Sequence, residues 1–149
     1  MSKAIGIYNI RLFIDSQLEH VRLLGSAVRG IGKELDLPGE QVGEIELMLV
    51  EAVNNVIEHA YENKPGSDVR VRVECEPSEQ IKLIISDQGH RIPALQVRTR
   101  LESNETSLPE PDSLPEGGWG LGLISILADS LHYECNQDGN HLHLCKQLA

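Results

Sequence analysis

Two segments in the first half of the chain carry hydrophobic residues at helical spacing. Residues 17–35 place apolar side chains at every third or fourth position, and residues 40–61 repeat this pattern after a Pro-Gly pair. The periodicity predicts two helices, each with one buried face. Ser16 directly precedes the first segment, and we expect its side chain to cap that helix.

Strands are predicted where apolar and polar residues alternate. Residues 5–14 and 69–75 show this alternation, which is typical of strands that are buried on one face only. Residues 80–87 are more continuously apolar. We therefore expect this third strand to lie in the centre of a sheet.

The second half of the chain begins with a long polar segment. Residues 99–117 include three prolines and five acidic residues, and a loop of this length is usually a lid, a binding loop or disordered. A helix is expected near 121–130, followed by two strands over 131–136 and 141–148 that the turn sequence NQDGN joins. This order of elements predicts an α+β fold, a two-layer sandwich with helices on one face of a mainly antiparallel sheet.

Length and charge limit the classes of function. The chain has 149 residues without an internal repeat or a linker, so we expect a single domain over residues 1–149. Its formal net charge of −10 argues against direct binding of nucleic acid, whose phosphates attract clustered Lys and Arg. No apolar run approaches the roughly 18 residues of a membrane span, and the N-terminal residues lack the pattern of a signal peptide. We therefore expect a cytoplasmic protein.

Three residues near the end of the chain could belong to a metal site. His141, His143 and Cys145 alternate, so a strand would place them on one face. They could ligate zinc, or they could form the outer face of a strand whose Leu142 and Leu144 point inward. Structural zinc sites usually close with four ligands. Because no fourth ligand is evident, we favour the second interpretation.

The sequence EAVNNVIEHAY, residues 51–61, contains the first group of residues that the fold alone does not require. Glu51 and Asn55 lie one helical turn apart, nearly opposite the apolar stripe. They could simply form the polar face of a helix. They could also project together into a cleft, where a carboxylate accepts a proton and an amide oxygen ligates a hard cation such as Mg²⁺. We expect His59 to pack under the sheet.

A second candidate group follows the predicted central strand. In ISDQGHRIP, residues 85–93, Asp87 ends the strand and Gly89 follows two residues later. Asp-x-Gly is common at ordinary turns. Alternatively, a carboxylate fixed at a strand end could accept a hydrogen bond from the amino group of a ligand.

The third group is the glycine-rich sequence EGGWGLGLI, which begins at Glu116. Four glycines between positions 117 and 122 immediately precede an apolar helix. They could form a flexible hinge at the end of the long loop. They could also let backbone N–H groups at a helix N-terminus bind a phosphate, which an acidic protein can do without Lys or Arg. The chain has no GxxxxGK sequence, so it contains no P-loop.

The order and spacing of these three groups resemble the GHKL ATPase domain, the Bergerat-type fold of gyrase, Hsp90, MutL and histidine kinases. The resemblance covers nearly the whole chain. The sequences EAVNN…EHAY and GGWGLGLI resemble those of the anti-sigma-factor serine kinases of bacterial partner-switching systems. Two departures are visible: Arg91 stands where many relatives have a second glycine, and Asn54 beside Asn55 leaves the register ambiguous, although the spacing from Glu51 favours Asn55.

The resemblance implies a role for each group, with ATP and Mg²⁺ as cofactors. Residues 94–117 would be the ATP lid. Glu51 would be the general base for a substrate serine, and Asn55 would be a Mg²⁺ ligand. Asp87 would accept a hydrogen bond from the adenine amino group, and Gly89 would let the adenine ring approach. The phosphates would be held by Gly118, Gly120 and Gly122, with the helix start at Leu121.

The resemblance also implies a function and partners. The chain would be an ATP- and Mg²⁺-dependent protein serine kinase that acts as an anti-sigma factor in the bacterial cytoplasm. It would phosphorylate a STAS-type antagonist protein, sequester a sigma factor or a similar regulator, and form a homodimer through the sheet or the first helix. The alternative is a non-catalytic ATP-binding switch module that regulates its target by protein contact alone.

Overall fold

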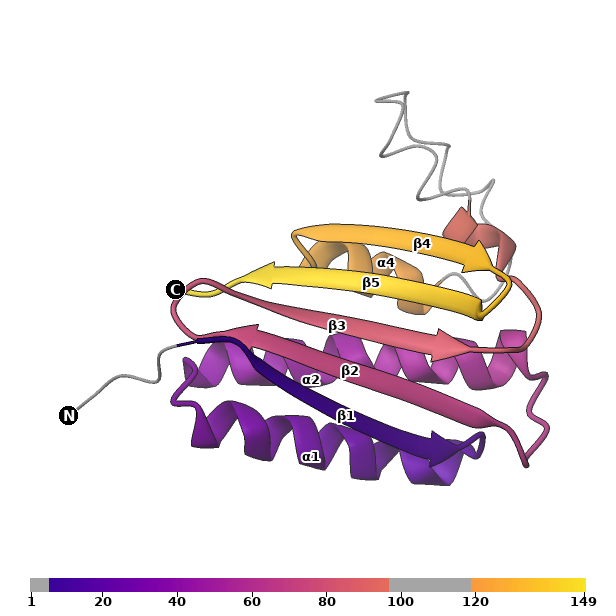
Figure 1. Cartoon of the computed structure of the whole chain (residues 1–149), viewed down its shortest axis with the longest axis horizontal. Coiled ribbons are helices and arrows are strands. Elements are labelled where there is room, and N and C mark those ends of the chain that lie inside the picture. Colours follow the sequence, from indigo (N-terminus) through magenta and orange to yellow (C-terminus); the bar gives the residue numbers. More distant parts are fainter. Residues whose placement is uncertain (1–5, 97–118) are drawn as a thin grey trace.

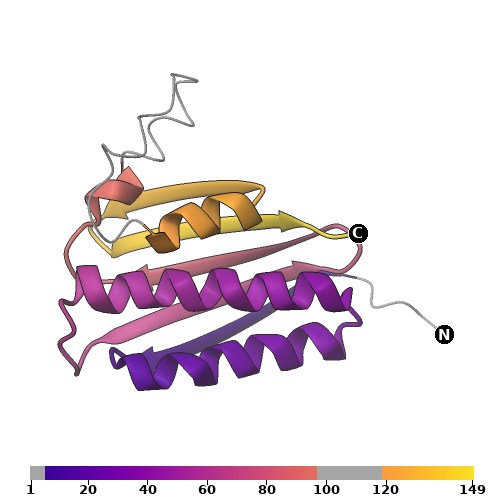
Figure 2. The ribbon, with the colours of Figure 1, turned by 180° about the vertical axis from the view of Figure 1, so that it is seen from behind.

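The structure, a computed structural model, describes residues 6–96 and 119–149 and has two layers. A five-stranded sheet forms one layer, and the helices cover one face of it (Figures 1 and 2). The strands are β1 (Tyr8–Asp15), β2 (Asp68–Glu76), β3 (Gln80–Asp87), β4 (Ser130–Asn136) and β5 (Gly139–Gln147). The helices are α1 (Val21–Glu34), α2 (Gly39–Asn55) and α4 (Trp119–Leu127).

The sheet has the strand order β1-β2-β3-β5-β4, and all neighbouring strands are antiparallel. β3 lies in the centre, as its apolar sequence predicted. The α+β sandwich with helices on one face is therefore confirmed. The pairing of β3 with β5 sets Asp87 opposite Asn140 at one end of the sheet, and the candidate site lies at this end.

Alternation along the strands separates the two faces of the sheet. On the helix-covered face, Val71, Leu83 and Leu142 are almost completely buried. On the other face, Arg70 of β2 pairs with Ser86 of β3, and Ser86 pairs with His141 of β5. The side chains of this second row are exposed or half-buried.

Helix α2 lies between α1 and α4 as well as against the sheet (Figure 2). Its environment is therefore more enclosed than a single apolar stripe predicts. Asn55 was expected nearly opposite that stripe, yet it is buried, with 5% of its surface exposed. This part of the prediction was wrong: α4, which begins at Trp119, packs against α2 and leaves less of its surface open than one apolar stripe implies.

Helix α2 continues beyond Asn55 as a π-helical turn, Val56–Ala60. The wider spacing is seen in the hydrogen bond from the Tyr61 N–H to the Val56 carbonyl, five residues earlier. π-helical turns are uncommon and often occur at functional sites. Here the turn sets the Ala60 carbonyl toward the segment after β3, where it accepts a hydrogen bond from the His90 N–H at 2.8 Å.

Two helix starts differ from the sequence-based expectation. Ser16 does not cap a helix: its hydroxyl donates to the Lys64 carbonyl at 2.6 Å and accepts from the Ser67 N–H at 3.1 Å, tying two loops together. A 3₁₀ turn, Leu18–His20, precedes α1 instead. Helix α4 begins at Trp119 rather than Leu121.

Across the two described ranges, none of the helices is both long enough and apolar enough to cross a membrane.

Candidate nucleotide-binding site

The end of α2 presents an amide and a carboxylate one turn apart. The Asn55 side-chain N–H donates to the Glu51 backbone carbonyl at 2.9 Å. This bond occupies the amide nitrogen, and Oδ1 accepts no hydrogen bond from another described residue. Glu51 is half-buried, and its carboxylate makes no hydrogen bond or ion pair to another described residue. An amide oxygen is a ligand of the kind that Mg²⁺ prefers. A carboxylate can accept a proton from a reacting group.

The neighbouring positions on this helix differ in exposure. Asn54 is only half-buried, whereas Asn55 is buried. His59 is exposed, so the expectation that it packs under the sheet was wrong. The π-helical turn rotates it away from the core.

Asp87 is a buried carboxylate at the end of β3, with 4% of its surface exposed. Its Oδ1 accepts hydrogen bonds from Asn140 Nδ2 and from the Gly89 N–H, both at 2.9 Å. Burial raises the pKa of the Asp87 carboxyl above its usual value, and these two hydrogen bonds oppose part of the rise. Both of them end on the same oxygen, so Oδ2 is left to accept from a ligand.

Asn140 is the residue that holds this carboxylate, and the sequence analysis missed it. Its amide nitrogen also lies 3.0 Å from the Gly89 carbonyl oxygen and 3.3 Å from that of His90. One side chain therefore fixes the carboxylate and the loop that follows it. A sequence signal existed: Asn140 is a polar residue at a core-facing position of β5, in step with Leu142.

Gly89 is required by a close backbone approach. A Cβ atom at this position would collide with the Ala60 carbonyl and come within 2.9 Å of the Tyr61 ring. The Tyr61 hydroxyl donates to the Asp68 carbonyl at 2.7 Å and accepts from the Gln88 N–H at 2.8 Å. The end of α2 and the end of β3 are therefore joined directly, which brings two of the three predicted groups together.

Helix α4 supplies the third group. Leu121 is buried, while a Cβ atom on Gly122 would meet no heavy atom of the described residues within 4 Å. Gly120 and Gly122 lie in the first turn of this helix, which packs against α2. Gly118 and most of the predicted lid over 94–117 lie outside the described residues, apart from a short helical turn at 93–96.

The three groups share one end of the molecule. Figure 2 shows the end of α2 and the beginning of α4 at the same end, next to the end of β3. The Glu51 carboxylate, the Asn55 amide, the buried Asp87 carboxylate and the open helical position of Gly122 are thereby brought into one region. Such a set can bind a polyanionic ligand through backbone N–H groups and a metal ion while the carboxylate recognises an amino group.

A hollow of about 430 Å³ is lined by Asp87 itself, together with Arg70, Ser86 and His141 among others. It does not include Asn55, Glu51 or α4. Because Glu51, Asn55 and the glycines of α4 belong to the helix layer, we place the candidate site on the helix side of Asp87.

The histidines and cysteine of β5 do lie on one face of the strand, as predicted. His141, His143 and Cys145 are all half-buried, on the face without helices. Ser86 Oγ and His141 Nδ1 are hydrogen-bonded at 2.7 Å. Among residues 6–96 and 119–149, no three His, Cys, Asp or Glu side chains are grouped so that they could hold a metal ion.

Comparison with known proteins gives a family and a set of relatives. The family model of the histidine kinase-like ATPase domain matches residues 14–146. The serine-protein kinase RsbW of Bacillus pumilus is 27% identical over 128 residues, which cover 85% of this chain and 78% of that protein. The RsbW of Halalkalibacterium halodurans is 28% identical over 122 residues, covering 82% and 73%, and that of Bacillus subtilis is 24% identical over 139 residues, covering 93% and 85%.

Solved structures show the same fold. The RsbU and RsbW domains of a Mycobacterium tuberculosis protein match 95% of this chain with a TM-score of 0.65 at 15% identity. The chain spans about a third of that protein, 32% of its length. The histidine kinase domain of a blue-light activated kinase from Erythrobacter litoralis matches 91% of the chain and 62% of its own length, with a TM-score of 0.52 at 20% identity.

Proposed function

The chain belongs to the family of histidine kinase-like ATPase domains, and from this premise we propose that it is an ATP- and Mg²⁺-dependent protein serine kinase of the anti-sigma-factor type. The enzyme class agrees with the names of its relatives, which are serine-protein kinases. Its substrate is a STAS-type antagonist protein, and its second partner is a sigma factor or a similar regulator. A bacterial cytoplasmic location and a homodimer belong to the same proposal.

One observation carries the proposal: the direct junction between the end of α2 and the end of β3. The hydrogen bond from His90 to the Ala60 carbonyl, together with the close approach of Gly89, holds Asp87 next to the helix that bears Glu51 and Asn55. An adenine-recognising carboxylate and a phosphate-handling helix must be adjacent if one nucleotide is to contact both.

The residues present fit the two cofactors. Asn55 Oδ1 is left free by its helix hydrogen bond and would hold Mg²⁺, and Asp87 Oδ2 would accept from the adenine amino group. Mg²⁺, when bound, neutralises charge on the phosphates and so assists phosphoryl transfer. The open first turn of α4, with Gly120 and Gly122, would present backbone N–H groups to the phosphates.

Glu51 would take the proton in the transfer step. The substrate serine oxygen forms a bond to the γ-phosphorus of ATP, the bond from that phosphorus to the β-γ bridging oxygen breaks, and ADP leaves. The serine hydroxyl proton passes to the Glu51 carboxylate. A half-buried carboxylate suits this role when no cation among the described residues pairs with its charge, as is the case for Glu51.

The test uses ATP labelled in the γ-phosphate and a STAS-type antagonist protein. The wild-type chain should transfer the label to a serine, and Glu51→Gln should lose transfer while it still binds ATP. Glu58→Gln is the matched control, since Glu58 is exposed on the same helical segment, and it should keep full activity. Transfer by Glu51→Gln would refute the role of Glu51. ATP binding without any transfer by the wild type would instead support the non-catalytic switch module.

A further inference from the structure

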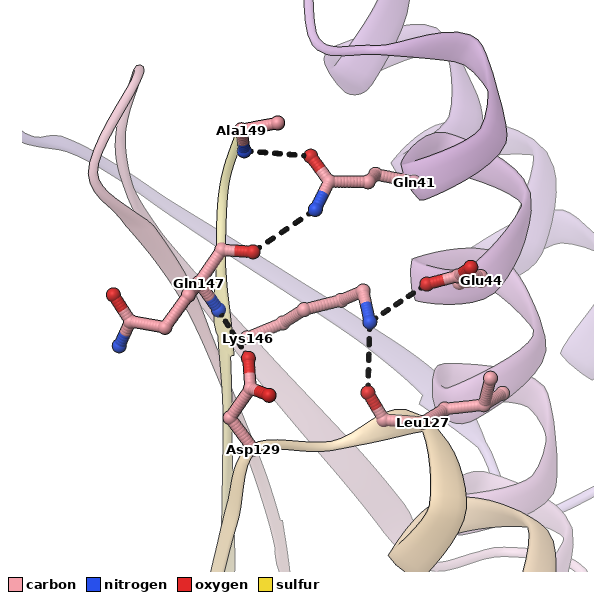
Figure 3. Close-up of polar contacts among 7 residues, drawn as sticks. All are labelled: Gln41, Glu44, Leu127, Asp129, Lys146, Gln147 and Ala149. Atoms are coloured by element: carbon pink, nitrogen blue, oxygen red, sulfur yellow. Dashed lines mark hydrogen bonds and ion pairs between the residues drawn. The ribbon is translucent and has the colours of Figure 1, made fainter.

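A buried lysine joins β5 to two helices, away from the residues that would contact ATP. Lys146 is only 8% exposed, which is rare for lysine unless its charge is paired. Figure 3 shows its ammonium between two partners: Glu44 Oε2 of α2 at 2.6 Å, and the Leu127 carbonyl oxygen of α4 at 2.8 Å. A lysine at a core-facing position of a strand therefore fastens one helix to the other.

The Leu127 contact occurs at the last residue of α4. The last carbonyl groups of a helix lack intrahelical partners and carry the negative end of the helix dipole, so an ammonium is stabilising there. The next residues are also tied to β5: the Asp129 N–H donates to the Cys145 carbonyl at 2.8 Å, and Asp129 Oδ2 accepts from the Gln147 N–H at 2.6 Å. The C-terminal end of α4 is thus fixed in place.

The Glu44 contact occurs on the side of α2 that bears the proposed base. Glu44 and Glu51 are seven residues apart, so they lie on nearly the same side of the helix, about 10.5 Å apart along its axis. Helices α2 and α4 run in opposite directions (Figure 2). Going back seven residues from Leu127 along α4 also covers about 10.5 Å and reaches Gly120. Fixing Leu127 beside Glu44 therefore sets Gly120 level with Glu51.

We infer that Lys146 is a positioning residue for the phosphate-binding turn of α4. It touches neither nucleotide nor protein substrate. By holding Leu127 to Glu44, it keeps the first turn of α4, with Gly120 and Gly122, level with the turn of α2 that bears Glu51. The inference rests on the proposed function, because the turn matters for activity only if ATP phosphates bind there.

The test compares two ligands, MgATP and adenosine, on the full chain. Adenosine would be recognised through Asp87 and does not reach the phosphate-binding turn. Lys146→Met should weaken MgATP binding on the order of tenfold, about 1.4 kcal/mol, because the first turn of α4 is no longer held level with Glu51. Adenosine binding should not change. Lys146→Arg keeps a cation near both partners. Its MgATP affinity should lie within about threefold of the wild-type value, a difference in binding free energy of less than about 1 kcal/mol.

Glu44→Gln is the second variant, and it tests the inference even if Lys146→Met does not fold. It keeps the lysine and the shape of the side chain, and it should weaken MgATP binding in the same selective way. Glu46→Gln is the matched control: it breaks the Arg29–Glu46 ion pair between α1 and α2, on the side away from α4, and should leave both affinities unchanged.

The outcomes separate the two proposals. Equal losses for MgATP and adenosine in Lys146→Met and Glu44→Gln, or no loss for either ligand, would overturn the inference alone. A wild-type chain that binds neither ligand would overturn the proposed function and the inference with it.

Discussion

Asn140 on β5 donates a side-chain hydrogen bond to the buried carboxylate of Asp87 on β3, over 2.9 Å. The two residues are opposite each other in the strand register, so the sheet itself brings the donor to the acceptor. The same amide contacts the carbonyl oxygens of Gly89 and His90. Asn140 therefore stabilises both the charge of the carboxylate and the path of the chain after it.

Asn140→Ala should destabilise the fold and weaken ATP binding together. The substitution leaves buried acceptors without their donor, and each such loss costs about 1–3 kcal/mol. Urea unfolding monitored by circular dichroism measures the change in the free energy of unfolding, and titration with MgATP measures the affinity. Asn9→Ala, at an exposed position of β1, should change stability by no more than about 0.5 kcal/mol. Equal stability of the two variants would contradict the role of Asn140.

Asp87→Asn should weaken ATP binding without destabilising the fold at neutral pH. The amide keeps an oxygen for the Gly89 and Asn140 donors, but its nitrogen replaces the Oδ2 that would accept from adenine. Loss of a hydrogen bond to a charged group is worth about 1.5–3 kcal/mol, so affinity should fall at least about tenfold. Nucleotide titration measures this loss.

The stability of Asp87→Asn relative to wild type should change with pH in a definite direction. Burial raises the pKa of Asp87 above 3.8 in the folded state, so the folded state holds the proton more tightly than the unfolded state. The stabilisation from this carboxyl is fully present below pH 3.8 and is lost as pH rises through the raised pKa. Asp87→Asn should therefore be at least as stable as wild type at pH 7, and any advantage should vanish toward pH 3.8.

Thermal unfolding between pH 3.5 and pH 8 checks this expectation. Asp36→Asn, which changes an exposed carboxylate, provides the control and should follow the wild-type profile. An Asp87→Asn variant that is less stable than wild type at pH 7, with the deficit shrinking in acid, would show that the carboxylate charge stabilises the fold.

Periodicity was enough to predict the five strands and the approximate positions of the helices, because burial on one face of a helix or strand is a local property of the sequence. The alternation of residues 69–75 and the apolar run of 80–87 both became strands in the expected places. The enclosed position of Asn55 could not be predicted in this way. It depends on α4, which reaches α2 only when the whole chain is folded.

The polar partners within the site depend on strand register. Asp87 and Asn140 are 53 residues apart, and no local pattern states that their strands pair. A weaker signal was nevertheless present. Asp87, Asn140 and Lys146 each place a polar side chain at a core-facing position of a strand, where a polar group needs a partner. The sequence analysis used this signal only for Asp87.

The start of α4 was misplaced for a physical reason. Glycine has a low helix propensity, which favours a start after the glycine cluster. In the structure the helix begins at Trp119 and includes Gly120 and Gly122 in its first turn. Packing of Leu121 and Ile124, both buried, outweighs the weak propensity of the glycines.

Gly122→Ala should separate the stability of the fold from the binding of phosphate. A Cβ atom at this position meets no heavy atom of the described residues within 4 Å, whereas one at Gly89 collides with the Ala60 carbonyl. Alanine in a helix is favoured over glycine by about 0.5–1 kcal/mol, so Gly122→Ala should be slightly more stable than wild type. Gly89→Ala should be less stable by about 1–3 kcal/mol, because the backbone must move.

The MgATP affinity of Gly122→Ala tests whether Gly122 makes room for the ATP phosphates. If the first turn of α4 receives the ATP phosphates, the added methyl group lies where they approach, and Gly122→Ala should bind MgATP more weakly while adenosine binding is unchanged. Gly30→Ala is the matched control: it lies in α1, has equally open space around its Cβ position, and should gain stability without any change in affinity. Unchanged MgATP affinity in Gly122→Ala would place the phosphates elsewhere, since an open helical glycine would then have no ligand to accommodate.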